Sequence, residues 1–222
     1  MEKSNVFTQL KFEKVAEKEM IHNSHTFFHN MEKRRSIRHF STKAVPKAII
    51  ENVIKTASTA PSGAHKQPWT FCPVSNKEIK AAIRKAAEAE EKISYGGRMS
   101  EKWLKDLEPF GTDWEKPMLE DAPWLIVVFM KSYDVVDGEK QKNYYVKESV
   151  GLAAGFLLAA IHQAGLCSLT HTPSPMAFLS KILDRPINEK AFLLIPVGYP
   201  TDNCKVPVLE RKNLDKVSVF YE

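Results

Sequence analysis

The sequence predicts one fairly large domain in which helices pack on a β-sheet, of the α/β or α+β class. Short apolar strands alternate with helical patterns, and no repeats or low-complexity segments interrupt them. A chain of 222 residues can bury a sizeable core, and 43% hydrophobic with 27% charged residues is ordinary for a globular protein. We expect a polar N-terminal arm with one helix over residues 1–30, followed by the domain itself over residues 31–222.

The first part of the domain contains two predicted helices and a strand between them. Pro46 suits the first turn of a helix, because its φ is fixed and it lacks an N–H. Trp69–Val74 has the composition of a short strand. A capping-box pattern, with Ser75 as N-cap and Glu78 three residues later, predicts that the second helix begins there. The apolar face of this helix is expected to comprise Ile79, Ala82, Ile83 and Ala86.

Residues 88–117 are rich in charged and aromatic side chains and poor in aliphatic ones. Such a composition does not build a core, so we predict that this segment is a mobile lid. Glu91 and Tyr95 are four residues apart and share a face if the segment is helical, and Lys116 follows later. These groups could hold a zwitterionic amino acid, whose ammonium needs an anion and whose carboxylate needs a cation. From the residues alone, a solvated charged helix explains the same pattern.

The second half of the domain alternates strands and helices. Trp124–Met130 is a continuous apolar run, typical of a strand buried on both faces. Asp137–Gly138 marks a turn, and a long helix is predicted over residues 143–163. Gly151 and Gly155 lie one turn apart in this helix and favour a close helix crossing. The remaining elements are expected to be a strand at Leu166–Thr170, a helix at Pro175–Leu183 and a strand at Phe192–Val197.

The charge pattern argues against nucleic acid as a partner. The net charge is +5, yet Lys and Arg are spread among 27 acidic residues rather than clustered on one face. The cysteines are odd in number and far apart, which suits a reducing cytoplasm better than a disulfide framework. No signal peptide is visible, and the longest apolar run, Val150–Ile161, is too short to span a bilayer. We therefore expect a cytoplasmic protein without a membrane or nucleic-acid partner.

The run Arg34-Arg35-Ser36-Ile37-Arg38 is the first candidate binding motif. Three guanidinium groups and a hydroxyl within five residues can bind an anion, because Arg donates in a fork that matches phosphate oxygens. A solvated basic turn is the alternative. His22, His25 and His29 could share a helical face, but no fourth ligand is evident nearby, and we predict no metal site.

The loop Pro61–Trp69 is a second candidate motif. In this loop Gly63 permits close backbone approach, Ser62 offers a hydroxyl and two prolines limit flexibility. Together with the arginine run, it resembles the nitroreductase superfamily, and within it the iodotyrosine deiodinases. The resemblance extends from Arg34 almost to the end of the chain. Further matching segments are Glu91–Tyr95, Trp114–Lys116, Leu169–Pro173, Pro196–Pro200 and Arg211–Lys212.

The resemblance implies an α+β nitroreductase-like fold, with a central mixed or antiparallel sheet, flanking helices and a helical active-site lid. It also implies a homodimer with two FMN sites at its interface. The matching cofactor-binding residues are Arg34, Arg35, Ser36, Ile37, Arg38, Ser62, Gly63, Thr170, His171, Thr172 and Arg211. The matching substrate-binding residues are Ala64, Glu91, Tyr95 and Lys116. Two of these are catalytic candidates: Thr172, whose hydroxyl would lie near the flavin N5, and Ala64, whose N–H would face the substrate phenolate.

The resemblance further implies FMN-dependent reductive dehalogenation of 3-iodo-L-tyrosine and 3,5-diiodo-L-tyrosine to tyrosine and halide. A general NAD(P)H-dependent nitroreductase or quinone reductase is the alternative, and a non-catalytic flavin-binding or amino-acid-sensing protein is another. No dinucleotide fingerprint is present, so NAD(P)H that binds transiently, or a partner reductase, is the expected electron source. The sequence departs from the family at His171, which stands between two threonines, and the membrane anchor of vertebrate deiodinases has no counterpart here.

Overall fold

The computed structural model describes residues 7–222 and divides into two compact units, one ending at Arg34 and one covering Arg35–Glu222. The first unit contains the helix α1 (Glu17–Met31), which has no buried residue, and within it His29 pairs with Glu32 at 2.8 Å. The predicted N-terminal arm thus contains one helix, although its first six residues lie outside the described residues.

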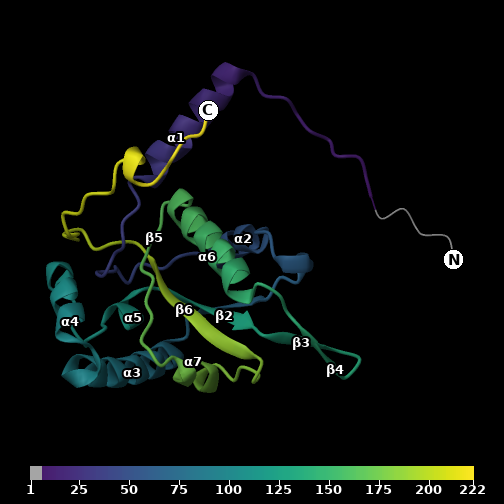
Figure 1. The fold of residues 1–222 in the computed structure, drawn as a ribbon. Helices are drawn as coiled ribbons and strands as arrows, with labels where there is room; N and C mark the ends of the chain where they lie inside the picture. The colour runs from purple at the N-terminus through teal and green to yellow at the C-terminus, as the bar shows by residue number, and fades with distance from the viewer. Residues whose placement is uncertain (1–6) are drawn as a thin grey trace. The chain divides into compact units, whose positions relative to one another are not determined.

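The second unit is built around a four-stranded sheet with the order β1-β2-β6-β5 (Figure 1). All three pairings in it are antiparallel. The α+β class and the antiparallel sheet are therefore confirmed. The strands are β1 (Trp69–Val74), β2 (Trp124–Lys131), β5 (Cys167–Ser168) and β6 (Glu189–Gly198). The bounds of β1 are as predicted, whereas β5 is shorter and β6 longer than the apolar runs indicate.

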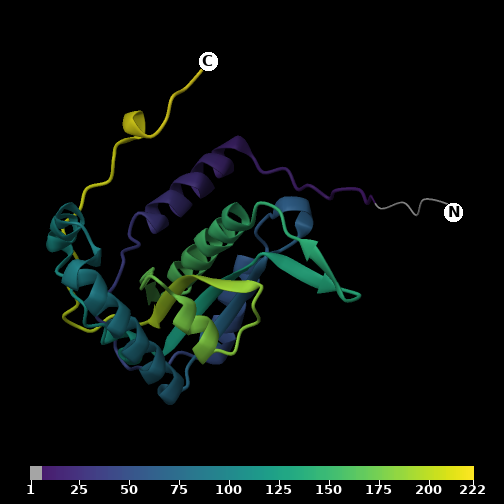
Figure 2. The same ribbon diagram turned by 60° about the horizontal axis from the view of Figure 1, so that its bottom comes forward.

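Helices cover both faces of this sheet, because the central strand β2 is apolar on each side. Ile126 and Val128 pack with α2 (Lys47–Ser58) and α6 (Val146–Gln163) on one face. The alternate residues of β2 pack with α3 (Lys77–Ile93) and α7 (Ala177–Ile182) on the other face. Figures 1 and 2 show the resulting three layers. Successive side chains of β2 point to opposite faces of the sheet, so this buried strand contributes to two separate cores.

Short elements complete the second unit. The hairpin of β3 (Tyr133–Val136) and β4 (Glu139–Lys142) turns at Asp137 and Gly138, which have φ of 52° and 81°. Positive φ at both residues is what a two-residue hairpin turn requires. The other short elements are η1 (Gly63–His65), η2 (Ser94–Arg98), α4 (Glu101–Leu107), η3 (Glu108–Phe110), α5 (Met118–Asp121) and η4 (Leu214–Lys216). The predicted lid therefore consists mainly of helical turns.

Three predicted details of the helices are wrong. The N-cap of α3 is Asn76 rather than Ser75, and its side chain accepts from the Ile79 N–H at 2.8 Å. Ala82 is exposed, and the buried face of α3 instead continues to Ala87. The long helix begins at Val146, because Tyr145 has a φ of 47° and cannot continue a helix.

Gly151 and Gly155 do not form the predicted close helix crossing within the second unit. A Cβ placed at either glycine meets none of the described atoms within 4 Å. Their neighbours Leu152 and Phe156 are exposed by 49% and 41%. This apolar stripe on α6 is thus available for contact with another surface.

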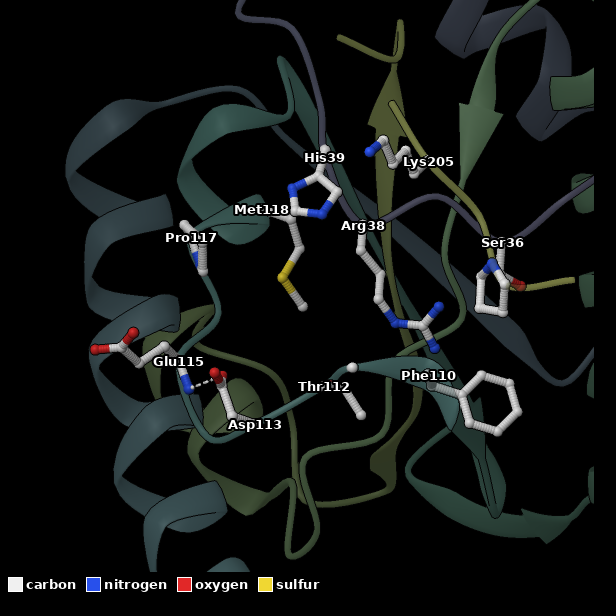
Figure 3. Close-up of a pocket in the computed structure, with 12 residues that line it drawn as sticks. Ser36, Arg38, His39, Phe110, Thr112, Asp113, Glu115, Pro117, Met118 and Lys205 are labelled. Atoms are coloured by element: carbon white, nitrogen blue, oxygen red, sulfur yellow. Dashed lines mark hydrogen bonds between the residues drawn. The ribbon is translucent and has the colours of Figure 1, made fainter. Parts of the chain in front are cut away.

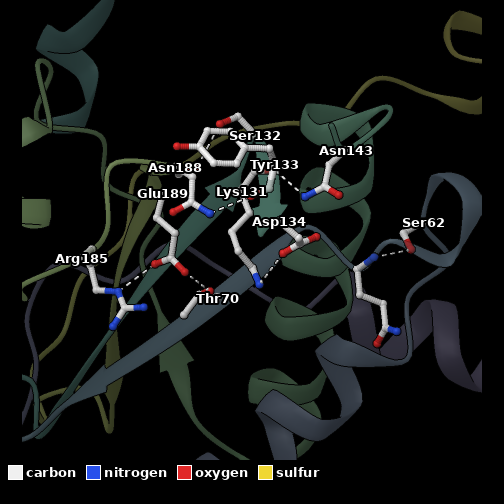
Figure 4. A network of polar contacts seen from close by, with 11 residues as sticks. Ser62, Thr70, Lys131, Ser132, Tyr133, Asp134, Asn143, Arg185, Asn188 and Glu189 are labelled. Atoms are coloured by element: carbon white, nitrogen blue, oxygen red, sulfur yellow. Dashed lines mark hydrogen bonds and ion pairs between the residues drawn. The ribbon is translucent and has the colours of Figure 1, made fainter. Parts of the chain in front are cut away.

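A polar network connects one end of the sheet to the hairpin and to the start of α6 (Figure 4). The buried Glu189 carboxylate accepts from the Thr70 hydroxyl at 2.6 Å and from Arg185 at 2.7 Å. The Asn143 amide donates to the Lys131 carbonyl at 3.1 Å. The bond from Asn143 thus attaches the chain just before α6 to the end of β2.

Candidate active site

Three side chains of the predicted lid form the centre of the candidate site, and we call Glu91, Tyr95 and Lys116 the clamp. The Lys116 ammonium lies 3.6 Å from a Glu91 carboxylate oxygen, and both side chains are almost completely buried, at 3% and 10% exposure. The same ammonium lies 5.3 Å from the centre of the Tyr95 ring. As expected, residues 88–117 contribute no side chain to the three apolar cores, but the segment does bury this ion pair.

The contacts within the clamp do not fully compensate the burial of its two charged groups. Burial raises the pKa of Glu91 and lowers the pKa of Lys116, and their mutual attraction only partly opposes these changes. The Lys116 Nζ is buried and has no hydrogen-bond partner among the described residues. A buried ammonium without an acceptor is costly, so the arrangement suits a ligand that supplies one.

The clamp opens on a cavity of about 240 Å³ that brings several predicted site residues together. Arg38 reaches this cavity from the segment beside β5, and Thr170, His171 and Thr172 line it from the chain that follows β5. The sequence interpretation missed its apolar wall, formed by Met99, Trp103, Leu107, Met118 and Leu169. The four-residue spacing of the first three of these could have indicated a helical face.

The arginine run is divided between several environments. Ser36 bridges Ser168 in parallel, which directs Arg38 into the candidate site. Arg38 lies 5.5 Å from the centre of the Phe110 ring and lines a second cavity, of about 190 Å³, together with Ser36 and Lys205 (Figure 3). Arg38 therefore borders both cavities, and the second one combines donors that suit an anion with the carboxylates of Asp113 and Glu115.

The other arginines occupy different positions. Arg35 donates to the Pro207 carbonyl, so its guanidinium ties the C-terminal segment to the start of the second unit. Ile37 is buried, and its N–H donates to the Ser168 carbonyl at 3.1 Å. Arg34 is the last residue of the first unit. Arg211 is an exposed residue of the C-terminal segment. Of the predicted phosphate-binding residues, the structure thus gathers Ser36 and Arg38 at the cavities.

The loop with Ser62, Gly63 and Ala64 is fixed against the start of α6. The Gly63 N–H donates to the buried Ser149 hydroxyl at 3.3 Å, and Ser62 accepts from the Gln67 N–H at 2.9 Å. Ala64 has a φ of 49°, a strained conformation for a residue with a side chain. Such strain is often retained at functional sites.

This loop does not belong to the clamp cavity of the same chain. Neither cavity described above is lined by Ser62, Gly63 or Ala64. Both views of the ribbon place η1 on the opposite side of α6 from α4 (Figures 1 and 2). One chain therefore contains two parts of the predicted site, and these parts are separated.

His171 is a residue whose placement the sequence does not reveal. Its backbone pairs with Leu194 in β6, and its Nε2 is buried without a hydrogen-bond partner among the described residues. Burial, followed by the charges of Lys116 and Arg38, lowers the pKa of His171 to about 3. His171 is thus a neutral imidazole at physiological pH.

No group of three or more metal-ligating side chains is found within residues 7–222. The rings of His25 and His29 stack with their centres 6.0 Å apart in α1. Over the same described range, none of the helices has the length and apolar character needed to cross a membrane.

Residues 31–199 match the family described as Nitroreductase. The chain belongs to the nitroreductase family. Within the family, it is 64% identical to an iodotyrosine deiodinase of Haliscomenobacter hydrossis over 204 residues, which are 91% of this chain and 92% of the relative. It is 46% identical to an iodotyrosine deiodinase of Hydra vulgaris over 211 residues, or 94% of this chain and 78% of the relative.

The fold of the chain is also similar to that of a solved structure. Oxidized iodotyrosine deiodinase bound to FMN and 3-iodo-L-tyrosine superposes with a TM-score of 0.74 at 30% identity, covering 87% of this chain and 100% of the other. The family resemblance predicted from the arginine run and the Ser62 loop is therefore confirmed.

Proposed function

We propose that this chain is an FMN-dependent enzyme that reductively removes halide from halotyrosines. The observation that carries the proposal is the clamp, in which a buried carboxylate and a buried ammonium form an ion pair at 3.6 Å, and the ammonium has no hydrogen-bond partner among the described residues. A zwitterionic amino acid would give Lys116 a carboxylate and Glu91 an ammonium. The identity to iodotyrosine deiodinases over most of the chain supports the same substrate class.

The residues present fit FMN. An anionic phosphate needs a group of donors, and Ser36, Arg38 and Lys205 provide one at the second cavity. We propose that Arg34, Arg35 and Arg211 add charge to this end, and that Ile37 contributes backbone contacts. Thr170, His171 and Thr172 would lie along the isoalloxazine, and Ser62 and Gly63 would meet its other edge. The bound flavin supplies the reducing equivalents.

The protein residues would bind and orient the substrate in three ways. Lys116 would hold the substrate carboxylate, Glu91 its ammonium, and Tyr95 would close one side of the clamp. The Ala64 N–H would donate to the phenolate oxygen and favour its negative charge. The Thr172 hydroxyl would donate at the flavin N5. Together these residues would orient the substrate and shield it from water.

The reaction balances with two electrons and one proton. The carbon–halogen bond breaks, a carbon–hydrogen bond forms at the same ring carbon, and halide leaves. We propose that the ring first takes the proton as a keto tautomer, so that the halide leaves as the phenol reforms. NAD(P)H or a partner reductase would restore the reduced cofactor.

We also propose that the active form is a homodimer in the cytoplasm. The separation of the Ser62 loop from the clamp within one chain supports a site completed by a second copy. The exposed stripe of Leu152 and Phe156 on α6 provides an apolar surface for such contact. The three free cysteines suit a reducing compartment.

The test uses purified protein loaded with FMN. Addition of 3-iodotyrosine is expected to perturb the flavin spectrum, and dithionite-reduced protein is expected to release iodide. Rapid turnover of nitroaromatics without iodide release would instead indicate a general nitroreductase. Bound FMN without turnover of either substrate would indicate a flavin-binding or sensing protein.

A further inference from the structure

Three side chains of α3 connect this helix to the segment that begins at Lys116. Lys80, Arg84 and Glu88 occur at four-residue intervals, so they lie on one face of the helix. Lys80 is buried, and its ammonium donates to the carbonyls of Glu120 and Ala122, each at 2.7 Å. We call Lys80, Arg84 and Glu88 the brace.

Glu88 joins the brace to the clamp. One of its carboxylate oxygens accepts from the Lys116 backbone N–H at 2.7 Å and from the Arg84 guanidinium at 2.7 Å. Arg84 also donates to the Glu120 carboxylate at 3.3 Å. Although burial opposes ionisation, the Lys116 N–H and Arg84 lower the pKa of Glu88, so it is a carboxylate at neutral pH. Charge-assisted hydrogen bonds of this kind are short and directional.

The brace spans the two halves of the clamp. Glu91 lies three residues after Glu88 on α3, one helical turn away. Lys116 belongs to a different segment, and its backbone contacts α3 through Glu88. The spacing between the anionic and cationic groups of the clamp therefore depends on a hydrogen bond made by a residue outside the clamp.

We infer that Glu88, supported by Arg84, is a positioning residue that sets the Glu91–Lys116 spacing and thereby selects zwitterionic amino acids. This inference rests on the proposed function. Glu88 need not touch the ligand. Its carboxylate fixes the Lys116 backbone, so that the ammonium meets a ligand carboxylate while Glu91 meets the ligand ammonium. Small displacements of such groups are costly, because binding requires both contacts at once.

The experiment compares three variants with wild type, all loaded with FMN. Glu88→Ala removes both hydrogen bonds at this carboxylate, and we expect the affinity for 3-iodotyrosine to fall by roughly tenfold or more. Glu88→Gln retains an oxygen that can accept from the Lys116 N–H, so its affinity is expected to stay within a few-fold of wild type. Glu51→Ala on α2, which removes a carboxylate from an exposed ion pair with Lys47, is the matched control and is expected to change nothing.

The affinity for FMN distinguishes a positioning role of Glu88 from a general loss of structure, because the proposed FMN-binding residues do not include the clamp. We expect the Kd for FMN to be the same in all three variants and in wild type. Glu88→Ala that binds 3-iodotyrosine as tightly as wild type overturns the inference, as does a parallel loss of FMN and iodotyrosine binding. If wild type itself does not bind 3-iodotyrosine, the proposed function fails, and this result is independent of Glu88.

Discussion

Burial moves the pKa of Glu91 upward and that of Lys116 downward, and these changes limit the pH range in which the clamp carries both charges. We expect halotyrosine affinity to fall as the pH drops through the raised pKa of Glu91 and as it rises through the lowered pKa of Lys116. The binding range should thus be narrower than the ordinary values of 4.5 and 10.5 allow. The range is measured by titrating the flavin spectrum with 3-iodotyrosine at several values between about pH 4 and about pH 10. An affinity that does not depend on pH would contradict the roles proposed for Glu91 and Lys116.

The same shifts mean that the clamp costs stability without its ligand. A raised folded-state pKa for Glu91 contributes stability below its unfolded value that is lost as the pH rises through the folded value. The lowered pKa of Lys116 contributes stability at high pH that is lost as the pH falls through the folded value. Burial thus disfavours the charged form of each group in the folded protein.

Replacement of both charges should relieve this cost. We expect the double variant Glu91→Gln/Lys116→Met to have a Tm at or above that of wild type, while halotyrosine affinity is lost. Lys116→Met alone leaves Glu91 buried without its partner and is expected to be less stable than the double variant. Thermal unfolding of wild type and these two variants at about pH 7 tests this order, and a double variant less stable than Lys116→Met would contradict it.

His171 is expected to make the free energy of unfolding depend on pH. Its folded pKa of about 3 lies below the ordinary 6.5, so between these values the unfolded chain binds more protons. Stability is then lost as the pH falls, by up to about 1.4 kcal/mol per pH unit. We expect His171→Asn to flatten the dependence of the unfolding free energy on pH between the two values, as measured with urea. Parallel curves for wild type and variant would show that His171 is accessible to protons.

At the residue scale, the sequence predicted several of the residues that the structure gathers at the clamp cavity, but not the contacts that they make. The family motifs pointed to the clamp and to Arg38, because chemistry restricts the residue types that can bind a zwitterion or a phosphate. They could not reveal that Arg35 bonds to the Pro207 carbonyl, since that contact joins segments far apart in the chain. The burial of a charged residue such as Lys116 cannot be predicted from its residue type either.

Among the elements, the Ser62 loop is closely restricted by its neighbours. A Cβ on Gly63 would lie 2.9 Å from the Tyr145 ring and 3.0 Å from the Tyr144 carbonyl. We expect Gly63→Ala to destabilise the protein by about 1–3 kcal/mol through overpacking and to lower deiodination by displacing Ala64. Gly96→Ala is the control, because a Cβ there meets no described atom within 4 Å. Equal unfolding free energies for the two variants would argue against the contact.

The hydrophobic pattern of the local sequence determines how well each helix or strand could be predicted. β1 and β2 have apolar runs bounded by prolines or charges, and both were located from sequence. The β3–β4 hairpin was missed apart from its turn, because β4 has no buried residue and hence no apolar alternation. The start of α6 was placed too early, because the left-handed conformation of Tyr145 depends on the packed loop and not on local composition.

For the whole molecule, the apolar stripe on α6 provides the sharpest test of the proposed dimer. We expect Phe156→Glu to yield a monomer that retains its fold and loses FMN, because the charge would be buried at the interface. Ile187→Glu, which alters an apolar side chain that is 91% exposed, is the control and should remain dimeric. Light scattering after size-exclusion chromatography measures the mass, and a dimeric Phe156→Glu would place the interface elsewhere.

The separation of the Ser62 loop from the clamp also has a genetic consequence. If each pocket takes its loop from one copy and its clamp from the other, two inactive proteins can complement each other. Gly63→Val damages one half of each pocket and Lys116→Met the other half. Random reassortment of the two proteins would make half of the dimers mixed, each with one intact pocket, and restore about a quarter of the wild-type activity. Two alleles that are null when alone would then be functional together in one cell.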